Sequence, residues 1–184
     1  MGTWLETPVI DQRDKRWART LMGKSTSSTI GDYGCLLNCA SALAGITPLE
    51  MNALWMAKGG YQTTPGKEAY AATFDFRRFH PAVPPVADYS QRYAYSPFPA
   101  AASARLVKWL KAGKVAVAEV DIMPNNNTHD MHYVLAVSAF GFGDSASIII
   151  NDPWRADQTT ITPRYGVTLA RALVHVIYYG EGTP

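Results

Sequence analysis

The sequence has few cysteines, few charges and no long apolar run, and each shortage excludes a class of protein. Only two of the 184 residues are cysteine, too few for the disulfide framework of a small secreted domain. No stretch approaches 18 consecutive apolar residues, so no membrane-spanning helix is expected. Charged residues make up 17% of the chain, the formal net charge is +2 and there is no basic stripe, so no nucleic-acid partner is expected.

The first ten residues also lack the basic region and the apolar region of a secretory signal peptide. We therefore expect the protein to be cytoplasmic when it is made. On this expectation it reaches a cell wall only within a phage particle or by another export route.

Length and composition fit one globular domain that covers residues 1–184. Hydrophobic residues make up 47% of the chain, and a chain of this length buries roughly 70% of its unfolded surface, which is enough for a core without disulfides or metals. Residues 61–100 are rich in Tyr, Phe and Pro. They are either an elaborated loop region or the part of the domain that faces a substrate.

Helix signals gather in the first half of the chain. A helix is expected to begin near Cys35, where an apolar stripe with 3.6-residue spacing starts, and to end at Gly45. Thr47 and Glu50 carry the sequence signature of a capping box, which predicts the start of a second helix. A third helix is expected over residues 102–110.

Strand patterns dominate the second half. Alternating valines predict a strand over residues 114–122, and apolar runs predict strands over 132–140, 147–151 and 174–179. A short strand is also expected over residues 7–10. Helices followed by consecutive strands favour an α+β fold, in which N-terminal helices pack on a C-terminal antiparallel sheet.

Cys35 is a candidate nucleophile because it stands at the expected junction between a loop and a helix. The N-terminus of a helix supplies partial positive charge and N–H groups, which lower the pKa of a thiol and favour the thiolate. The preceding Gly34 lets backbone or substrate approach closely. Cys39 lies one turn deeper in the helix and is expected to pack in the core.

A thiolate nucleophile needs a base from elsewhere in the chain, and the sequence has four histidines. His80 lies in the irregular middle of the chain, His129 in an Asn-rich turn and His175 inside an apolar strand. His132 leads a strong strand, which would hold the imidazole rigidly in front of a helix N-terminus. His132 is therefore the predicted base.

Asp152 is the predicted third member of the site, and its role is to orient the imidazole of His132. It follows the next strand, and in an antiparallel pair the start of one strand lies beside the end of the other. Residues 151–153 taken alone also suit an ordinary turn, but the register with His132 favours the catalytic interpretation. An oxyanion needs a further donor, and Gln12 is either that donor or a solvated loop glutamine.

Four segments resemble stand-alone relatives of cysteine peptidase family thirty-nine, which includes the bacteriocin-processing peptidases that cut after double-glycine leaders. These segments are residues 11–18, 29–37, 132–135 and 150–154. The resemblance implies a papain-like cysteine peptidase fold with four catalytic residues: Gln12 at the oxyanion, Cys35 as nucleophile, His132 as base and Asp152 as its orienter. Gln12 lies 23 residues before Cys35, farther than in the transporter-linked members, and nothing resembles an ATP-binding cassette.

The same resemblance implies a hydrolase that cleaves peptide or amide bonds and needs no cofactor or metal. Relatives without signal peptides often belong to phage or bacterial lysis systems, in which the bond cut lies in peptidoglycan. Others process peptides or proteins. The expected partner is therefore a peptide or peptidoglycan substrate.

Two other interpretations stay open. His129 and His132, with Asp152 nearby, suit a zinc site, although they precede a strand and no third spaced ligand is evident. Five Trp and ten Tyr residues suit a non-enzymatic module that binds a wall or a sugar, although most of them are expected in the core. Loss of activity with a chelator would favour zinc, and full function of a Cys35→Ala variant would favour the binding module.

Overall fold

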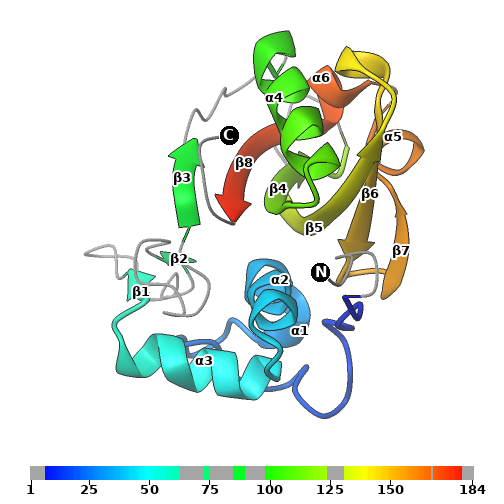
Figure 1. The fold of residues 1–184 in the computed structure, drawn as a ribbon. Coiled ribbons are helices and arrows are strands. Elements are labelled where there is room, and N and C mark those ends of the chain that lie inside the picture. Colours follow the sequence, from blue (N-terminus) through cyan, green and yellow to red (C-terminus); the bar gives the residue numbers. More distant parts are fainter. Residues whose placement is uncertain are drawn as a thin grey trace.

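Helices lie on both faces of one antiparallel sheet (Figure 1). The expected α+β class, with helices ahead of an antiparallel sheet, is confirmed. The computed structural model describes residues 7–62, 73–74, 85–89, 98–123, 131–166 and 168–179.

The helices are α1 (Ile30–Tyr33), α2 (Cys35–Ala44), α3 (Pro48–Ala57), α4 (Ala100–Lys111), α5 (Ile161–Arg164) and α6 (Leu169–Ala172), with a 3₁₀ turn η4 (Gly143–Ser145). The strands of the main sheet are β3 (Pro85–Tyr89), β4 (Val115–Asp121), β5 (Met131–Phe140), β6 (Ser147–Asp152), β7 (Asp157–Thr160) and β8 (Leu173–Tyr179). Two shorter strands, β1 (Tyr61–Gln62) and β2 (Thr73–Phe74), pair with each other. The main sheet has the order β3-β8-β4-β5-β6-β7.

The three predicted helices are present, and the signals predicted for α2 and for the start of α3 are confirmed. α2 begins at Cys35 and ends before Gly45, whose φ of 66° suits a residue without a side chain. At the start of α3, Thr47 and Glu50 exchange the two hydrogen bonds of a capping box. The predicted third helix is α4, which extends a little beyond 102–110 at both ends. No helix in the described part of the chain is long and apolar enough to span a membrane.

The segment directly before Cys35 forms the short helix α1, which the sequence did not indicate. α1 is a single turn, and the side chain of Thr29 accepts a hydrogen bond from the backbone N–H of Asp32 at its start. This capping contact gives the short turn a fixed beginning. The chain therefore enters α2 from a folded segment.

The four strands predicted in the second half are present, with small changes at their ends. The prediction of a strand over residues 7–10 is wrong, because this segment is a loop whose Thr7 carbonyl accepts a hydrogen bond from the side chain of Asn151. β7 was not predicted, because its polar sequence lacks apolar alternation. It forms as an edge strand against β6.

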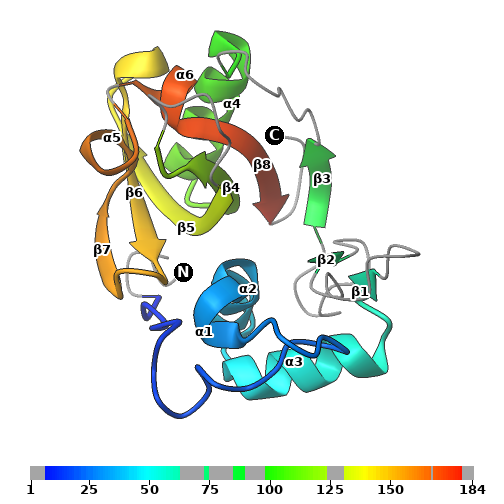
Figure 2. The ribbon, with the colours of Figure 1, turned by 180° about the vertical axis from the view of Figure 1, so that it is seen from behind.

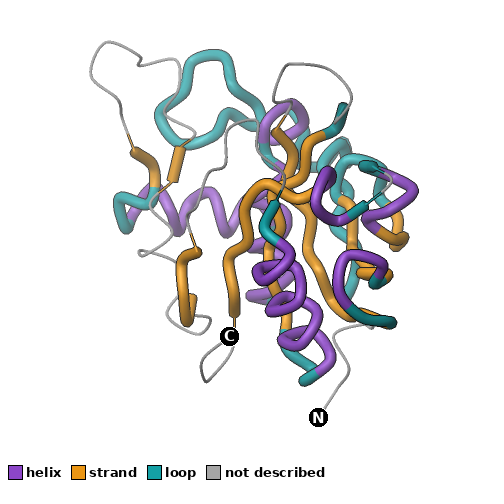
Figure 3. Tube along the Cα trace, turned by 90° about the horizontal axis from the view of Figure 1, so that it is seen from above, coloured by secondary structure: helices purple, strands orange, loops and turns teal. Residues whose placement is uncertain are grey.

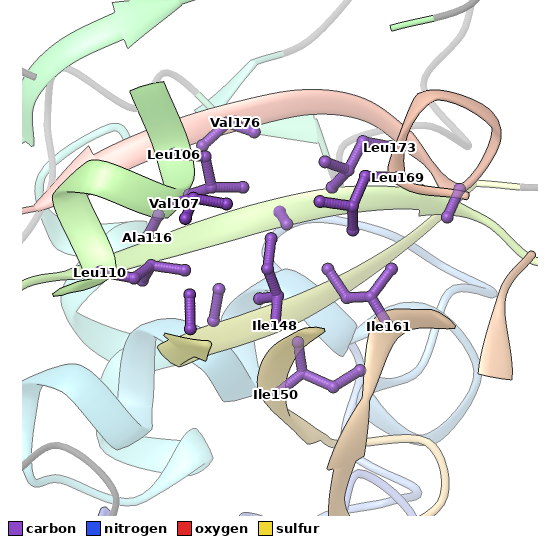
Figure 4. Packing of buried hydrophobic residues seen from close by; sticks show 14 of the residues in the cluster. Leu106, Val107, Leu110, Ala116, Ile148, Ile150, Ile161, Leu169, Leu173 and Val176 are labelled. Carbon is purple, nitrogen blue, oxygen red and sulfur yellow. The ribbon is translucent and has the colours of Figure 1, made fainter. Parts of the chain in front are cut away.

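The central strands send alternate side chains into two cores. Val115 and Val117 of β4 pack with the helices α2 and α3, whereas Ala116 and Ala118 pack on the opposite face with α4. Figure 4 shows this second core, in which Leu106 of α4 meets the sheet. Both faces of β4 are therefore buried against apolar side chains. Each large apolar side chain buried there contributes about 1.5–3 kcal/mol to the stability of the fold.

Two layers of helices cover the two faces of the sheet. α1 to α3 lie on one side of the sheet, and α4 to α6 gather on the other, as the front and back views show (Figures 1 and 2). Seen from above, α4 runs over the strands (Figure 3). α2 packs directly against β5, so the first residue of α2 lies near the edge where β5 begins and β6 ends.

Candidate active site

Cys35 occupies the first position of α2, directly after Gly34. The first N–H groups of a helix have no acceptor within it and carry partial positive charge, which favours a thiolate. The side chain of Cys35 is partly exposed, so a reactant can reach it. A glycine is needed at position 34. A Cβ there would overlap the carbonyl oxygen of Ile30 and lie 2.8 Å from Cγ2 of Ile30.

Cys39 is buried in the core, as predicted. Its thiol donates a hydrogen bond of 3.6 Å to the carbonyl oxygen of Tyr133. Burial, together with nearby Cys35 and Asp152, raises the pKa of the Cys39 thiol well above its ordinary value, which disfavours a thiolate at this position. The same contact fixes α2 against β5 one residue away from His132.

His132 is the second residue of β5 and is buried. Its Nε2 lies 2.9 Å from Oδ1 of Asp152. Cys35 is close enough to interact with the His132 side chain, and this interaction raises the pKa of His132. Because Nε2 is committed to Asp152, Nδ1 is the nitrogen left for the thiol. The three residues predicted from the sequence are therefore neighbours, in the order thiol, imidazole, carboxylate.

The surroundings of His132 favour its charged form. Burial alone lowers the pKa of His132, but hydrogen bonds and charge interactions with Asp152 and Cys35 outweigh burial and raise the pKa to about 9. The imidazole is therefore protonated at neutral pH. A cysteine nucleophile needs a positive charge beside it, and the His132 imidazolium supplies one next to Cys35.

Asp152 ends β6 and is buried among donors. Its Oδ1 accepts from His132 and from the N–H of Trp154 at 3.0 Å, and its Oδ2 accepts from Arg164 Nη1 at 3.0 Å and from the hydroxyl of Tyr165. Burial by itself would raise the pKa of Asp152. The hydrogen bonds from His132 and Tyr165, with the charge of His132, outweigh burial and lower the pKa to about 2. The carboxylate thus stays ionised and holds the imidazole.

Gln12 is buried, so it is not a solvated loop glutamine. Its backbone N–H donates to the carbonyl oxygen of Pro153 at 2.9 Å, and its Nε2 donates to the carbonyl oxygen of Gly31 at 3.0 Å. Nε2 carries a second N–H, and Oε1 has no partner among the described residues. Gln12 therefore lies between the segment after Asp152 and the turn that leads to Cys35.

Trp154 covers the imidazole from one side. The rings of His132 and Trp154 meet edge to face, with centroids 6.3 Å apart. The guanidinium of Arg13 lies over the Trp154 ring, 3.7 Å from its centroid. This cation–π contact holds the indole in place. Trp154 thus limits the access of water to the His132–Asp152 hydrogen bond.

The other histidines do not belong to this group. His175 is buried in β8, where Nδ1 lies 3.5 Å from Oε2 of Glu119, and Glu119 also accepts a hydrogen bond of 2.8 Å from the hydroxyl of Tyr133. His80 and His129 lie outside the described residues, so the zinc interpretation stays a hypothesis. Within the part of the chain that the structure describes, no group of three His, Cys, Asp or Glu is placed to hold a metal.

Three side chains at the site were missed by sequence reasoning: Trp154, Arg164 and Tyr165. Trp154 stands two residues after Asp152, in a segment already selected, so its position was a usable signal. Arg164 and Tyr165 come after an unpredicted strand, at the end of the short helix α5. No local pattern connects them to Asp152, because only the pairing of β7 with β6 brings them there.

Comparison with known proteins gives no relative for this chain: no family model, no curated protein and no solved structure matches it. A functional interpretation therefore depends on the geometry of the site and on its chemistry.

Proposed function

We propose that this protein is a papain-like cysteine peptidase, with Cys35 as nucleophile, His132 as base and Asp152 as the residue that orients the base. One observation carries the proposal: buried His132 bonds to Asp152 at 2.9 Å through Nε2 and interacts with partly exposed Cys35 at the start of α2. A nucleophile at the start of a helix that packs on an antiparallel sheet supports the papain-like arrangement.

The first half of the reaction forms an acyl-enzyme. The thiolate sulfur of Cys35 attacks the carbonyl carbon of the substrate and makes a C–S bond, while the C=O electrons move onto the oxygen. The second N–H of Gln12 and the backbone N–H of Cys35 stabilise this oxyanion. When the oxyanion collapses, the C–N bond breaks and His132 gives its proton to the leaving amine.

The second half releases the acid. His132, now neutral, accepts a proton from water as the water oxygen attacks the thioester carbonyl. Collapse of this second intermediate breaks the C–S bond and restores the Cys35 thiolate beside the imidazolium. Asp152 stays ionised throughout and keeps the imidazole in position, which its pKa of about 2 permits.

The proposed substrate is a peptide bond in the stem or bridge of peptidoglycan, cut by a phage or bacterial lysis enzyme. Peptide or protein processing is the second candidate. Tyr33, two residues before Cys35, is exposed and offers apolar surface to a substrate. This surface suits either substrate, and a direct assay separates them.

The substrate test is digestion of purified peptidoglycan sacculi, followed by mass spectrometry of the soluble fragments. Wild type and Cys39→Ala should release the same fragments, and Cys35→Ala should release none. The fragments would name the bond. If wild type releases nothing from sacculi of several wall types, wall hydrolysis is wrong, and a peptide library becomes the substrate to test.

The nucleophile can be tested without any substrate. Low-dose iodoacetamide at pH 6 should alkylate partly exposed Cys35 at least tenfold faster than buried Cys39, as measured by peptide mass spectrometry. Cys39 serves as the reference thiol in the same molecule. His132→Gln should reduce this difference, because the imidazolium is lost. Equal rates at the two thiols in wild type would contradict an activated Cys35.

A further inference from the structure

The carboxylate of Asp152 is bonded on both of its oxygens, and the two sides have different partners. Oδ1 faces His132, whereas Oδ2 accepts from Arg164 Nη1 at 3.0 Å and from the hydroxyl of Tyr165. Burial, and then the neighbouring Asp152, raise the pKa of Tyr165, so the phenol stays protonated and donates. Both donors come from α5 and the residue after it, elements outside the predicted triad.

Arg164 is shared between two carboxylates. Its Nη2 lies 2.6 Å from Oδ2 of Asp157 and its Nη1 lies 3.1 Å from Oδ1 of the same residue, while Nη1 also reaches Asp152. The Arg164 side chain is 23% exposed and the Asp157 side chain is 44% exposed, whereas Asp152 is buried. A chain of charged contacts therefore runs from a half-exposed carboxylate on β7 to the imidazole.

Hydrogen-bond donors on Oδ2 fix the orientation of the Asp152 carboxylate. The carboxyl group of an aspartate turns easily about its last torsion, and the bonds that Oδ1 accepts from His132 and from the N–H of Trp154 hold only one of its two oxygens. Two donors on the opposite oxygen define that plane, and with it the direction in which Oδ1 faces Nε2 of His132. The planar guanidinium suits this task, because its N–H groups have fixed directions.

The charged and titratable groups around His132 and Asp152 come from several elements. His132 is faced by Cys35 from α2, by Asp152 from β6 and by Tyr165, the residue after α5. The ring centroid of Tyr165 lies 5.8 Å from the imidazole centroid. Asp152 is faced by His132, Tyr165 and Arg164, and by the buried thiol of Cys39. Arg164 is thus the one permanent cation among the described groups that touch the triad, and Asp157 competes with Asp152 for it.

We propose that Arg164 is a positioning residue for the His132–Asp152 pair, and that Asp157 sets how strongly the Arg164 charge acts on that pair. The proposal rests on the function proposed above. Removing the cation makes the surroundings of His132 more negative, which opposes loss of its proton. Removing the charge of Asp157 has the opposite sign, because the Arg164 charge is then less neutralised.

The test is the pH profile of Cys35 alkylation by iodoacetate, an anion that reacts best with a thiolate beside an imidazolium. The high-pH limb of this profile reports loss of the His132 imidazolium. Arg164→Gln should move this limb to higher pH by about half a unit, and Asp157→Asn should move it to lower pH by a similar or smaller amount. Arg164→Lys keeps the charge and should leave the limb near that of wild type.

Opposite shifts from two neighbouring substitutions cannot come from general loosening of the fold, which would change both variants in the same way. Unchanged limbs in Arg164→Gln and Asp157→Asn overturn the proposal. If Arg164→Gln does not fold, by circular dichroism and thermal unfolding, the exposed Asp157→Asn variant decides alone: a downward shift supports the proposal and no shift overturns it. If wild-type Cys35 reacts no faster than Cys39, it is the proposed peptidase function that fails.

Discussion

The backbone N–H of Gln12 donates a hydrogen bond of 2.9 Å to the carbonyl oxygen of Pro153, the residue that follows Asp152. This contact joins the opening segment of the chain to the end of β6. The side chain of Gln12 bonds in the other direction, to the carbonyl oxygen of Gly31 before α2. Gln12 therefore links the two parts of the chain that carry the proposed nucleophile and the aspartate.

Gln12→Ala should lower kcat by about a hundredfold and leave KM nearly unchanged, because an oxyanion donor acts mainly in the transition state. Losing a buried hydrogen bond should also destabilise the fold by about 1–2 kcal/mol. Steady-state kinetics on the identified substrate and urea unfolding measure the two effects. The control is Gln158→Ala on β7, an exposed glutamine for which full activity is expected. A Gln12→Ala variant that is less stable but fully active would exclude the oxyanion role.

The two glycines that flank α2 should respond differently to alanine. At Gly34 a Cβ would collide with the backbone of Ile30, so Gly34→Ala should displace Cys35 and reduce its alkylation rate at least tenfold. At Gly45 a Cβ meets nothing within 4 Å, but the φ of 66° disfavours alanine, so Gly45→Ala should lose only about 1 kcal/mol of stability. Alkylation rates and thermal unfolding of both variants check this. Equal losses of Cys35 reactivity would contradict a specific role for Gly34.

Local signals explain why so much of the fold was predictable. The capping residues Thr47 and Glu50 define the start of α3 within four residues of sequence, and Gly45 defines the end of α2. The contact between His132 and Asp152 was also predictable, because consecutive antiparallel strands bring the start of β5 beside the end of β6. In these cases the information lies in short segments or in the simplest strand connection.

The contacts of Arg164 and Tyr165 with Asp152 could not be predicted, because they depend on an edge strand with no apolar pattern. β7 has the polar sequence Asp157–Thr160, and its pairing with β6 carries Arg164 and Tyr165 to the carboxylate. A polar edge strand gains its stability from the neighbouring strand, which local sequence does not show. The expected loop or substrate-facing region at residues 61–100 lies mostly outside the described residues, so that prediction stays open.

Trp154→Ala should lower kcat/KM by about tenfold, because water then reaches the His132–Asp152 hydrogen bond and weakens it. The pKa of His132 should change from about 9, because entry of water reduces the burial that lowers this pKa and weakens the hydrogen bond that raises it. Titration of the His132 imidazole by NMR measures the shift. Trp154→Phe keeps an aromatic ring and should retain most of the activity. If the pKa of His132 is the same in Trp154→Ala and in wild type, Trp154 does not shield the pair.

The raised pKa of His132 predicts how stability depends on pH. Because the folded-state pKa is about 9 and the ordinary value is 6.5, the stabilisation is fully present below pH 6.5 and is lost as pH rises through about 9. The loss should be roughly 1–3 kcal/mol, seen as a falling urea midpoint between pH 6.5 and 9. The pKa of Asp152 is lowered to about 2 from 3.8, so its contribution is present above pH 3.8 and is lost as pH falls through 2.

Two variants separate His132 from other groups that titrate in the alkaline range. In His132→Gln the fall of the urea midpoint between pH 6.5 and 9 should disappear. In Cys35→Ala it should remain but occur at lower pH, because the hydrogen bond and the charge of Cys35 no longer help to raise the pKa of His132. Parallel curves for wild type and His132→Gln would show that the alkaline loss comes from elsewhere in the protein, and would contradict a protonated His132 at neutral pH.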